Sequence, residues 1–240
     1  MKKPYQLLAK FYDKEEWGKY SLQYLEIINI LKTKYDISFN TILDISCGTG
    51  DLIHELSKEY KVVGSDISEE MINVAKNKYP KMTFILSDMA NLKLLNRFDL
   101  IISPFDSINY LAERNHLKRA FLNINNLLNK GGHFIFDFNT EKLFEDKHHG
   151  VFDKNTCGVS YKQICEYDKE TKTAKTIFDF GGDEKEIHIQ KAINYDEIDE
   201  LLNECGFKIK YSHDIFKDES INENSYKIII LAGITDGIGV

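Results

Sequence analysis

The chain has 240 residues, of which 42% are hydrophobic and 29% charged, and its net charge of −7 makes it acidic; these values fit one large globular α/β domain. No apolar run approaches the ~20 residues that cross a bilayer, and the first residues lack the apolar stretch of a secretory signal, which predicts a cytoplasmic protein without a membrane partner. The acidic balance disfavours a nucleic-acid partner, because proteins that bind nucleic acids usually carry a basic surface.

Residues 1–40 are expected to form a helical N-terminal segment. From Thr41 to Phe138, short apolar runs then alternate with amphipathic stretches, which is typical of a mainly parallel sheet flanked by helices. A helix is predicted over residues 117–128, where apolar residues recur at helical spacing, and Gly131-Gly132 provides its stop. Five strands are predicted, at residues 41–45, 61–66, 82–87, 98–103 and 132–138.

Between residues 158 and 193 the apolar residues alternate with polar ones at a period of two, in three runs separated by turn-forming residues. This pattern predicts a three-stranded antiparallel insertion, and residues 141–193 are therefore expected to form a β-rich unit. Two interpretations of this unit stay open. It either caps the active site and contacts the substrate, or it is a purely structural extension of the sheet.

After the insertion, Asn194 begins a predicted helix that ends at Gly206. Two strands follow, at residues 207–216 and 225–233. The residues between them are too few for a crossover helix, so the two strands should be antiparallel. Residues 41–140 and 194–240 are thus expected to form a single core around the insertion.

A predicted buried strand runs into a glycine turn over residues 42–50, with the sequence Ile-Leu-Asp-Ile-Ser-Cys-Gly-Thr-Gly. Gly48 and Gly50 let the backbone turn tightly and leave no side chain between the main chain and a ligand. The alternative is a routine turn from strand to helix. Ile53 stands where the dinucleotide-binding fingerprint requires a third glycine, which disfavours a nicotinamide dinucleotide.

Acidic residues follow the next two predicted strands. Asp66 ends the second strand, where a carboxylate accepts hydrogen bonds from both hydroxyls of a ribose; its alternative role is to cap the helix that starts near Ser68. After the third strand, Asp88 offers an acceptor for an adenine amine, and Met89 offers an apolar side chain for the ring face. The alternative for Asp88 is a solvated loop acid or a cap.

The chain resembles the class I S-adenosylmethionine-dependent methyltransferases in the successive motifs Leu43-Asp44, Cys47-Gly48-Thr49-Gly50, Gly64 to Ser68, Asp88-Met89 and Phe98 to Ile101. The resemblance implies a Rossmann-like α/β fold whose seven-stranded, mostly parallel sheet has an antiparallel last strand. It also implies S-adenosylmethionine as the cofactor, with its methionine end on the glycine loop. Ser46 departs from the family, which commonly has glycine there. The candidate cofactor-binding residues in this core are Asp44, Cys47, Gly48, Gly50, Asp66, Asp88, Met89 and Ser103.

Three further segments, at residues 5–13, 106–111 and 136–140, resemble a subgroup of small-molecule methyltransferases that includes aminosugar N-methyltransferases. This resemblance implies a small-molecule methyl acceptor and a substrate pocket built partly from the β-rich piece after the fifth strand. It also implies that Tyr5 or Tyr12 closes over the methionine end of the cofactor. The alternative for both tyrosines is to anchor the N-terminal segment by packing.

Polar residues are also expected near the ends of the fourth and fifth strands, where ligands collect in such sheets. Our hypothesis is that Asp106 or Tyr110 orients the methyl acceptor. The histidines lack a partner acid at recognisable spacing, and the cysteines form no Cys-x-x-Cys pair, so no metal site is predicted. The predicted function is methyl transfer to nitrogen or oxygen of a small molecule. The alternatives are a nicotinamide-dependent oxidoreductase and an inactive methyltransferase-like binding domain.

Overall fold

The computed structural model describes residues 2–15, 20–111 and 113–235, without the side chains of residues 21 and 22. Parts of three expected segments, 1–40, 41–140 and 194–240, therefore lie outside the described residues. They are residues 1, 16–19, 112 and 236–240. Among the described residues, no helix is long and apolar enough to cross a membrane.

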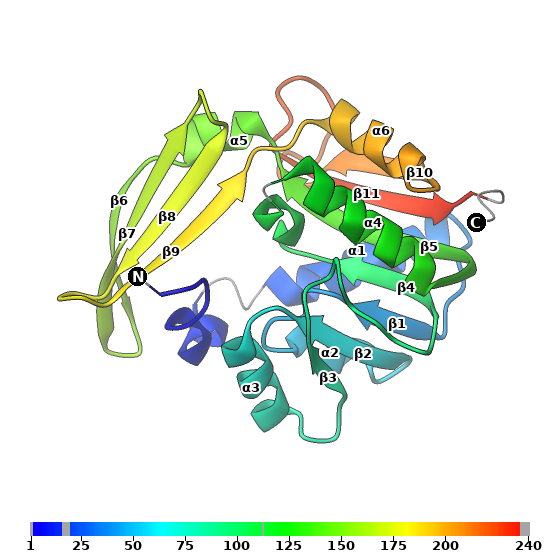
Figure 1. Cartoon of the computed structure of the whole chain (residues 1–240), viewed down its shortest axis with the longest axis horizontal. Coiled ribbons are helices and arrows are strands. Elements are labelled where there is room, and N and C mark those ends of the chain that lie inside the picture. The colour runs from blue at the N-terminus through cyan, green and yellow to red at the C-terminus, as the bar shows by residue number, and fades with distance from the viewer. Residues whose placement is uncertain (1, 16–19, 112, 236–240) are drawn as a thin grey trace.

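The core of the molecule is a seven-stranded sheet with the strand order β10-β11-β5-β4-β1-β2-β3 (Figure 1). Strands β1 to β5 run parallel, whereas β11 pairs antiparallel with both of its neighbours. The predicted sheet, mostly parallel with an antiparallel last strand, is confirmed. The strands are β1 (Thr41–Asp44), β2 (Lys61–Asp66), β3 (Phe84–Leu86), β4 (Phe98–Ser103), β5 (Leu128–Asn139), β10 (Phe207–Asp214) and β11 (Lys227–Ile234).

Helices cover both faces of this sheet. On one face, α4 and α6 bury apolar residues such as Phe121 and Leu201 against Phe136 of β5. On the other face, α1 and α2 pack residues such as Ile28 against Ile135 of the same strand. Because neighbouring residues of a strand point to opposite faces, a strand buried on both sides reads as one apolar run. The helices are α1 (Tyr20–Lys34), α2 (Asp51–Leu56), α3 (Glu69–Lys78), α4 (Arg114–Leu127), α5 (Glu141–Lys147) and α6 (Tyr195–Glu204).

The insertion is a separate antiparallel sheet of four strands, one more than predicted. Its strands are β6 (Gly150–Thr156), β7 (Val159–Asp168), β8 (Thr173–Asp179) and β9 (Lys185–Lys191). The missed strand, β6, lies at the edge and exposes Val151 and Phe152, with exposed fractions of 60% and 45%. An edge strand with little burial lacks the alternation from which strands are predicted.

The N-terminal segment lies along the insertion sheet (Figure 1). Its backbone begins with a bridge from Lys2 to Glu186 of β9, and the Lys2 amide donates to the carbonyl of Lys185 at 3.1 Å. Two short 3₁₀ turns follow, η1 (Leu8–Lys10) and η2 (Tyr12–Lys14). Leu8 of η1 and Phe11, which lies between the two turns, pack against aromatic residues of the insertion.

Candidate active site

The carboxyl ends of β1, β2 and β3 open into a cavity of about 820 Å³. In the sheet order, β1 lies between β4 and β2, so successive connections leave it in opposite directions and a crevice forms at this point. The volume falls within the range of roughly 300–1,000 Å³ that is usual for small-molecule sites. Residues of the N-terminal segment, from Lys3 to Tyr12, close one side of the cavity.

The glycine turn after β1 forms part of the cavity wall. Gly48 lines the cavity with φ of +52°, and a Cβ added there would meet no atom within 4 Å. Its bare backbone therefore leaves room for a ligand. Gly50, predicted to contact the cofactor, is not among the lining residues, and its added Cβ would lie 2.9 Å from the Phe84 ring. Position 50 therefore requires glycine, because a side chain there would overlap Phe84 where α2 begins to pack against the sheet.

Helix α2 approaches β2 closely although it lacks the third glycine of the dinucleotide fingerprint. A glycine on β2, Gly64, allows this approach instead. A Cβ on Gly64 would lie 2.6 Å from Cδ1 of Ile53 and 2.9 Å from Sγ of Cys47. Gly64 thus provides the space that Ile53 occupies. Cys47 lines the cavity as predicted, and burial raises the pKa of its thiol.

Asp66 combines the two roles that the sequence left open. One carboxylate oxygen accepts from the Gly48 amide at 2.8 Å, and the other accepts from the Ser68 amide at 2.9 Å. Each oxygen keeps a lone pair for a further donor, and the residue lines the cavity. Burial raises the pKa of Asp66 despite these backbone hydrogen bonds.

Asp44 lies at the end of β1 and also lines the cavity. Its carboxylate accepts from the Ser46 amide at 3.0 Å. Burial, with a smaller contribution from Asp66, raises the pKa of Asp44 to about 8. A positively charged ligand beside this carboxyl group would favour its ionised form.

Asp88 and Met89 line the same cavity, as predicted. Asp88 accepts from the Ala90 amide at 2.9 Å, and its other oxygen lies 3.1 Å from Nε2 of His116. His116 comes from α4 and lines the cavity too. Leu86 adds an apolar side chain that is 50% exposed.

Ser103 and Asp106 lie outside this cavity. Ser103, a predicted cofactor-binding residue, is fully buried, and its hydroxyl lies 3.1 Å from that of Ser46. It therefore supports the glycine turn from behind. Asp106 follows Phe105, and both adopt left-handed backbone conformations, with φ of 60° for Phe105 and 49° for Asp106. Residues other than glycine adopt this backbone conformation at a cost of roughly 1–2 kcal/mol. The turn directs the side chain of Asp106 toward a second cavity.

The second cavity, of about 420 Å³, adjoins the first. Both are lined by Tyr5, Tyr12, Phe105 and Tyr110, which form the shared wall. Burial raises the pKa of all three tyrosines, which keeps the phenols protonated at neutral pH. The sequence-predicted tyrosines therefore meet at the junction of the two cavities.

Two carboxylates and one ammonium line the second cavity. Nζ of Lys227 lies 2.6 Å from Asp106 and 3.3 Å from the fully buried Asp137. Burial lowers the pKa of Lys227, but the two carboxylates outweigh it and raise that pKa overall. Burial raises the pKa of Asp137, against the effect of Lys227. Among the described residues, Oδ1 of Asn139 is buried without a hydrogen-bond partner.

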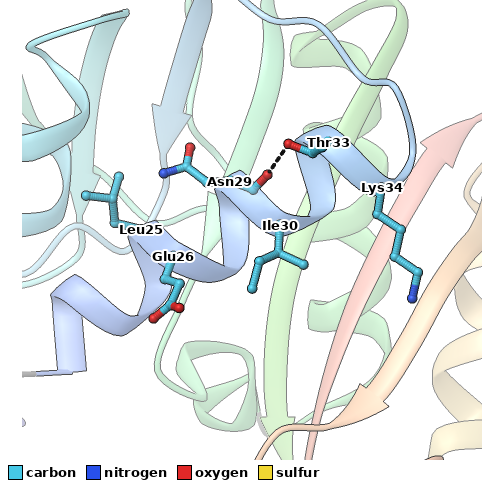
Figure 2. Close-up of a pocket in the computed structure, with 6 residues that line it drawn as sticks. All are labelled: Leu25, Glu26, Asn29, Ile30, Thr33 and Lys34. Carbon is cyan, nitrogen blue, oxygen red and sulfur yellow. Dashed lines mark hydrogen bonds between the residues drawn. The ribbon is translucent and has the colours of Figure 1, made fainter.

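A further hollow lies on the outer face of α1, away from these groups. Figure 2 shows that its lining side chains all come from one helix; they are Leu25, Glu26, Asn29, Ile30, Thr33 and Lys34. The hydrogen bond drawn there runs within the helix, from the Thr33 hydroxyl to the Asn29 carbonyl at 3.0 Å. Since no described residue from another element lines this hollow, we place the active site at the sheet edge.

Comparison with known proteins decides the family. A methyltransferase-domain family matches residues 42–132. A protein named “putative methyltransferase” in Geobacillus sp. (strain WCH70) is 30% identical over 208 residues, 80% of this chain and 83% of that protein. A crystal structure of an S-adenosylmethionine-dependent methyltransferase from Clostridium acetobutylicum is 26% identical, with a TM-score of 0.79, over 96% of this chain and 99% of that one. The chain belongs to the S-adenosylmethionine-dependent methyltransferases.

This methyltransferase also shares its fold with an amino pentose methyltransferase from Micromonospora echinaspora that was solved with S-adenosylmethionine bound. The identity is 16% and the TM-score 0.72, over 92% of each chain. The predicted Rossmann-like fold, enzyme class and cofactor are confirmed. The nicotinamide-dependent oxidoreductase, kept as an alternative from the sequence, is wrong.

Several residues of the methyltransferase site were not identified from the sequence. Lys227 belongs to the last strand and His188 to the insertion, and both are far from the glycine turn along the chain. Neither belongs to a motif of recognisable spacing. The one available signal was the polar character of His188 and Gln190 on alternate positions of a predicted strand, which places them on one face.

Proposed function

We propose that this methyltransferase holds S-adenosylmethionine in the larger cavity and methylates nitrogen or oxygen of a small polar molecule in the smaller one. The observation that carries the proposal is the wall of Tyr5, Tyr12, Phe105 and Tyr110, which borders both cavities. A methyl group passes directly from donor to acceptor only where the two sites adjoin. When bound, the cofactor supplies an electrophilic methyl group on a sulfonium.

The residues of the larger cavity fit the cofactor. Gly48 leaves open space for the methionine end, and Asp44 would face its ammonium. Asp66 has lone pairs for the ribose hydroxyls. Beside Asp88, the apolar side chains of Leu86 and Met89 supply a surface for the adenine ring.

The finer proposal concerns the acceptor. Asp106 and Asp137 outnumber the ammonium of Lys227 in the smaller cavity, which favours a basic amine over an acidic compound. An amino sugar fits this chemistry, and a structural neighbour acts on an amino pentose. Asp106 or Tyr110 would orient the acceptor. Orientation of two reactants contributes on the order of 7–11 kcal/mol in favourable cases.

We also propose that residues 141–193 act as the substrate cap, with residues 1–40 as a segment that links it to the core. Side chains from three strands of the insertion line the smaller cavity: Gln163 of β7, Thr176 and Phe178 of β8, and His188 of β9. A purely structural extension would not contribute side chains there.

Calorimetric titration tests the cofactor site. S-adenosylmethionine and S-adenosylhomocysteine should bind, and a nicotinamide dinucleotide should not. In Asp66→Ala, loss of charge-assisted hydrogen bonds worth about 1.5–3 kcal/mol each should weaken binding at least roughly tenfold. Asp99→Ala is the matched control, because its carboxylate also accepts from two backbone amides, those of Asn40 and Thr41, but does not line the larger cavity. Equal affinity in Asp66→Ala and the wild type would contradict the ribose assignment.

Methyl transfer tests the acceptor site. The protein and labelled S-adenosylmethionine are incubated with a panel of amino sugars, other small amines and alcohols. Amines should be methylated and acidic compounds should not. Unchanged turnover of the best acceptor in both Asp106→Ala and Tyr110→Phe would remove these two residues from acceptor orientation.

A further inference from the structure

Four side chains form a continuous hydrogen-bonded chain that ends in the wall between the cavities. Oε1 of Glu186 lies 2.6 Å from Nε2 of His188, and Nδ1 of His188 lies 2.7 Å from the Tyr110 hydroxyl. The Tyr110 hydroxyl in turn lies 3.2 Å from that of Tyr5. Glu186 and His188 are two residues apart on β9 and therefore share one face of the strand.

The buried end of this chain is a carboxylate held by several donors. Glu186 is fully buried and accepts from the backbone amides of Tyr5 and Leu7, each at 2.6 Å, and of Leu8 at 3.2 Å. Burial alone would raise the pKa of Glu186, but the His188 hydrogen bond and the backbone amides lower it overall. The carboxylate is thus ionised and accepts at every contact.

The ionised Glu186 fixes the tautomer of His188. Because Glu186 only accepts, the hydrogen of the neutral imidazole lies on Nε2. Nδ1 then accepts from the Tyr110 hydroxyl, which points the basic nitrogen toward the shared wall. Anchoring the N-terminal segment requires Glu186 alone, so packing does not account for the bond from Tyr110 to His188.

We propose that Glu186 and His188 form a relay that removes the acceptor's proton through Tyr110 during methyl transfer. The inference rests on the proposed function. As the acceptor nitrogen or oxygen forms its bond to the methyl carbon, the carbon–sulfur bond of the donor breaks and leaves a thioether. The acceptor's proton passes to Oη of Tyr110, and the proton of Tyr110 passes to Nδ1 of His188.

After this step His188 is an imidazolium paired with the carboxylate of Glu186. Glu186 stays ionised and stabilises the charged His188, and solvent later takes the proton. Tyr110 is the catalytic residue in this scheme because it touches the acceptor. His188 and Glu186 act through it and are positioning residues.

The test uses the whole protein, labelled S-adenosylmethionine and a synthetic amino pentose as the probe. In His188→Ala, kcat should fall by on the order of a hundredfold, as for loss of a general base, while KM for S-adenosylmethionine should stay within about twofold, because His188 does not line the larger cavity. Added imidazole should restore turnover, and the restored rate should rise with basicity across substituted imidazoles. If imidazole only filled the cavity left by the His188 side chain, the restored rate would not depend on the basicity of the imidazole.

Two further variants separate chemistry from folding. His188→Gln can still donate to Glu186 and accept from Tyr110, yet it cannot take a proton, so its kcat should fall as far as that of His188→Ala. His133→Ala is the control, since His133 is similarly buried on β5 and lies 2.7 Å from Nζ of Lys210 rather than in the relay; its kcat should match the wild type.

Three outcomes would overturn the relay. The first is a kcat in His188→Gln within about threefold of the wild type, well below the effect of losing a general base. The second is rescue that ignores the basicity of the imidazole. The third is binding of S-adenosylmethionine without methylation of the amino pentose or of any amine or alcohol in the panel, which would leave the cofactor assignment standing. Absence of S-adenosylmethionine binding would instead overturn the proposed function.

Discussion

Two glycines of one turn have different tasks. Gly48 faces open space in the larger cavity, whereas the Cβ of any residue at position 50 would collide with the ring of Phe84. The sequence motif presents them as equivalent, because the spacing of glycines does not record which atoms lie opposite each Cβ.

The two tasks predict different effects of an alanine substitution at the two positions. Gly48→Ala adds backbone strain of about 1–2 kcal/mol and places a methyl group in the cofactor's space. The binding free energy of S-adenosylmethionine should therefore fall by more than the free energy of unfolding. Gly50→Ala has similar backbone strain and in addition overpacks against the Phe84 ring, which typically costs 1–3 kcal/mol. The melting temperature of Gly50→Ala should therefore be lower than that of Gly48→Ala. Calorimetric titration and thermal unfolding of both variants measure this. A larger stability loss in Gly48→Ala would contradict the assignment.

Asp44 predicts a pH dependence of cofactor binding. Its pKa of about 8 means that it is mostly protonated in the free protein at neutral pH. A cationic ligand lowers that pKa, so the complex holds fewer protons and affinity should rise with pH, by at most roughly tenfold per unit between about pH 6 and pH 7.5. Titrations of S-adenosylmethionine across that range measure the slope.

Asp44→Asn is the variant that isolates this effect, because Asp66 has a raised pKa as well and titrates in the same direction. The variant keeps a side-chain oxygen for the Ser46 amide but cannot ionise. Its slope of affinity against pH should be shallower than that of the wild type. An identical slope would exclude Asp44 as the titrating group.

At the scale of elements, helix α2 and strand β2 approach each other through Ile53 and Gly64. Gly64→Ala should destabilise the protein by typically 1–3 kcal/mol through overpacking. Ile53→Val removes Cδ1, the atom 2.6 Å from the added Cβ, so Gly64→Ala should cost less in the Ile53→Val background. Chemical denaturation of the four proteins in this double-mutant cycle gives the coupling. Additive effects would contradict direct packing between the two residues.

The elements of the core were predicted because their signals are local. Alternating apolar runs and helix stops located the strands and the main helices, and the glycine turn located the cofactor end of the sheet. The fifth strand nevertheless begins at Leu128 and passes through Gly131-Gly132, where a stop was expected. There β5 pairs with β4 across a register shift between Phe98 and Leu100, a feature of tertiary pairing that no local pattern records.

At the scale of the whole molecule, the N-terminal segment connects the insertion to the cofactor site. Glu186 of β9 holds its backbone, and Asp13 pairs with Lys78 of α3 and accepts from the Thr49 hydroxyl. The segment therefore contacts the insertion, α3 and the glycine turn at once. This arrangement explains how Tyr5 and Tyr12 come to lie in the wall between the cavities.

Assembly of the acceptor side could not be predicted from the sequence. Its polar groups come from β5, β11 and the turn after β4 in the core, and from β7, β8 and β9 of the insertion; the two sets meet only because the insertion folds over the sheet. The cofactor side, by contrast, is built from residues that directly follow successive strands. Parallel strands bring such residues to one edge, so the order of the sequence suffices to place them together.

A crystal structure with S-adenosylhomocysteine would test the two-cavity arrangement most directly. The ligand density should fill the larger cavity, with the ribose hydroxyls on Asp66, the adenine beside Asp88 and Met89, and the sulfur facing the wall of Tyr5 and Tyr110. Density that leaves Asp66 without a ligand contact, or places the sulfur away from that wall, would contradict the account.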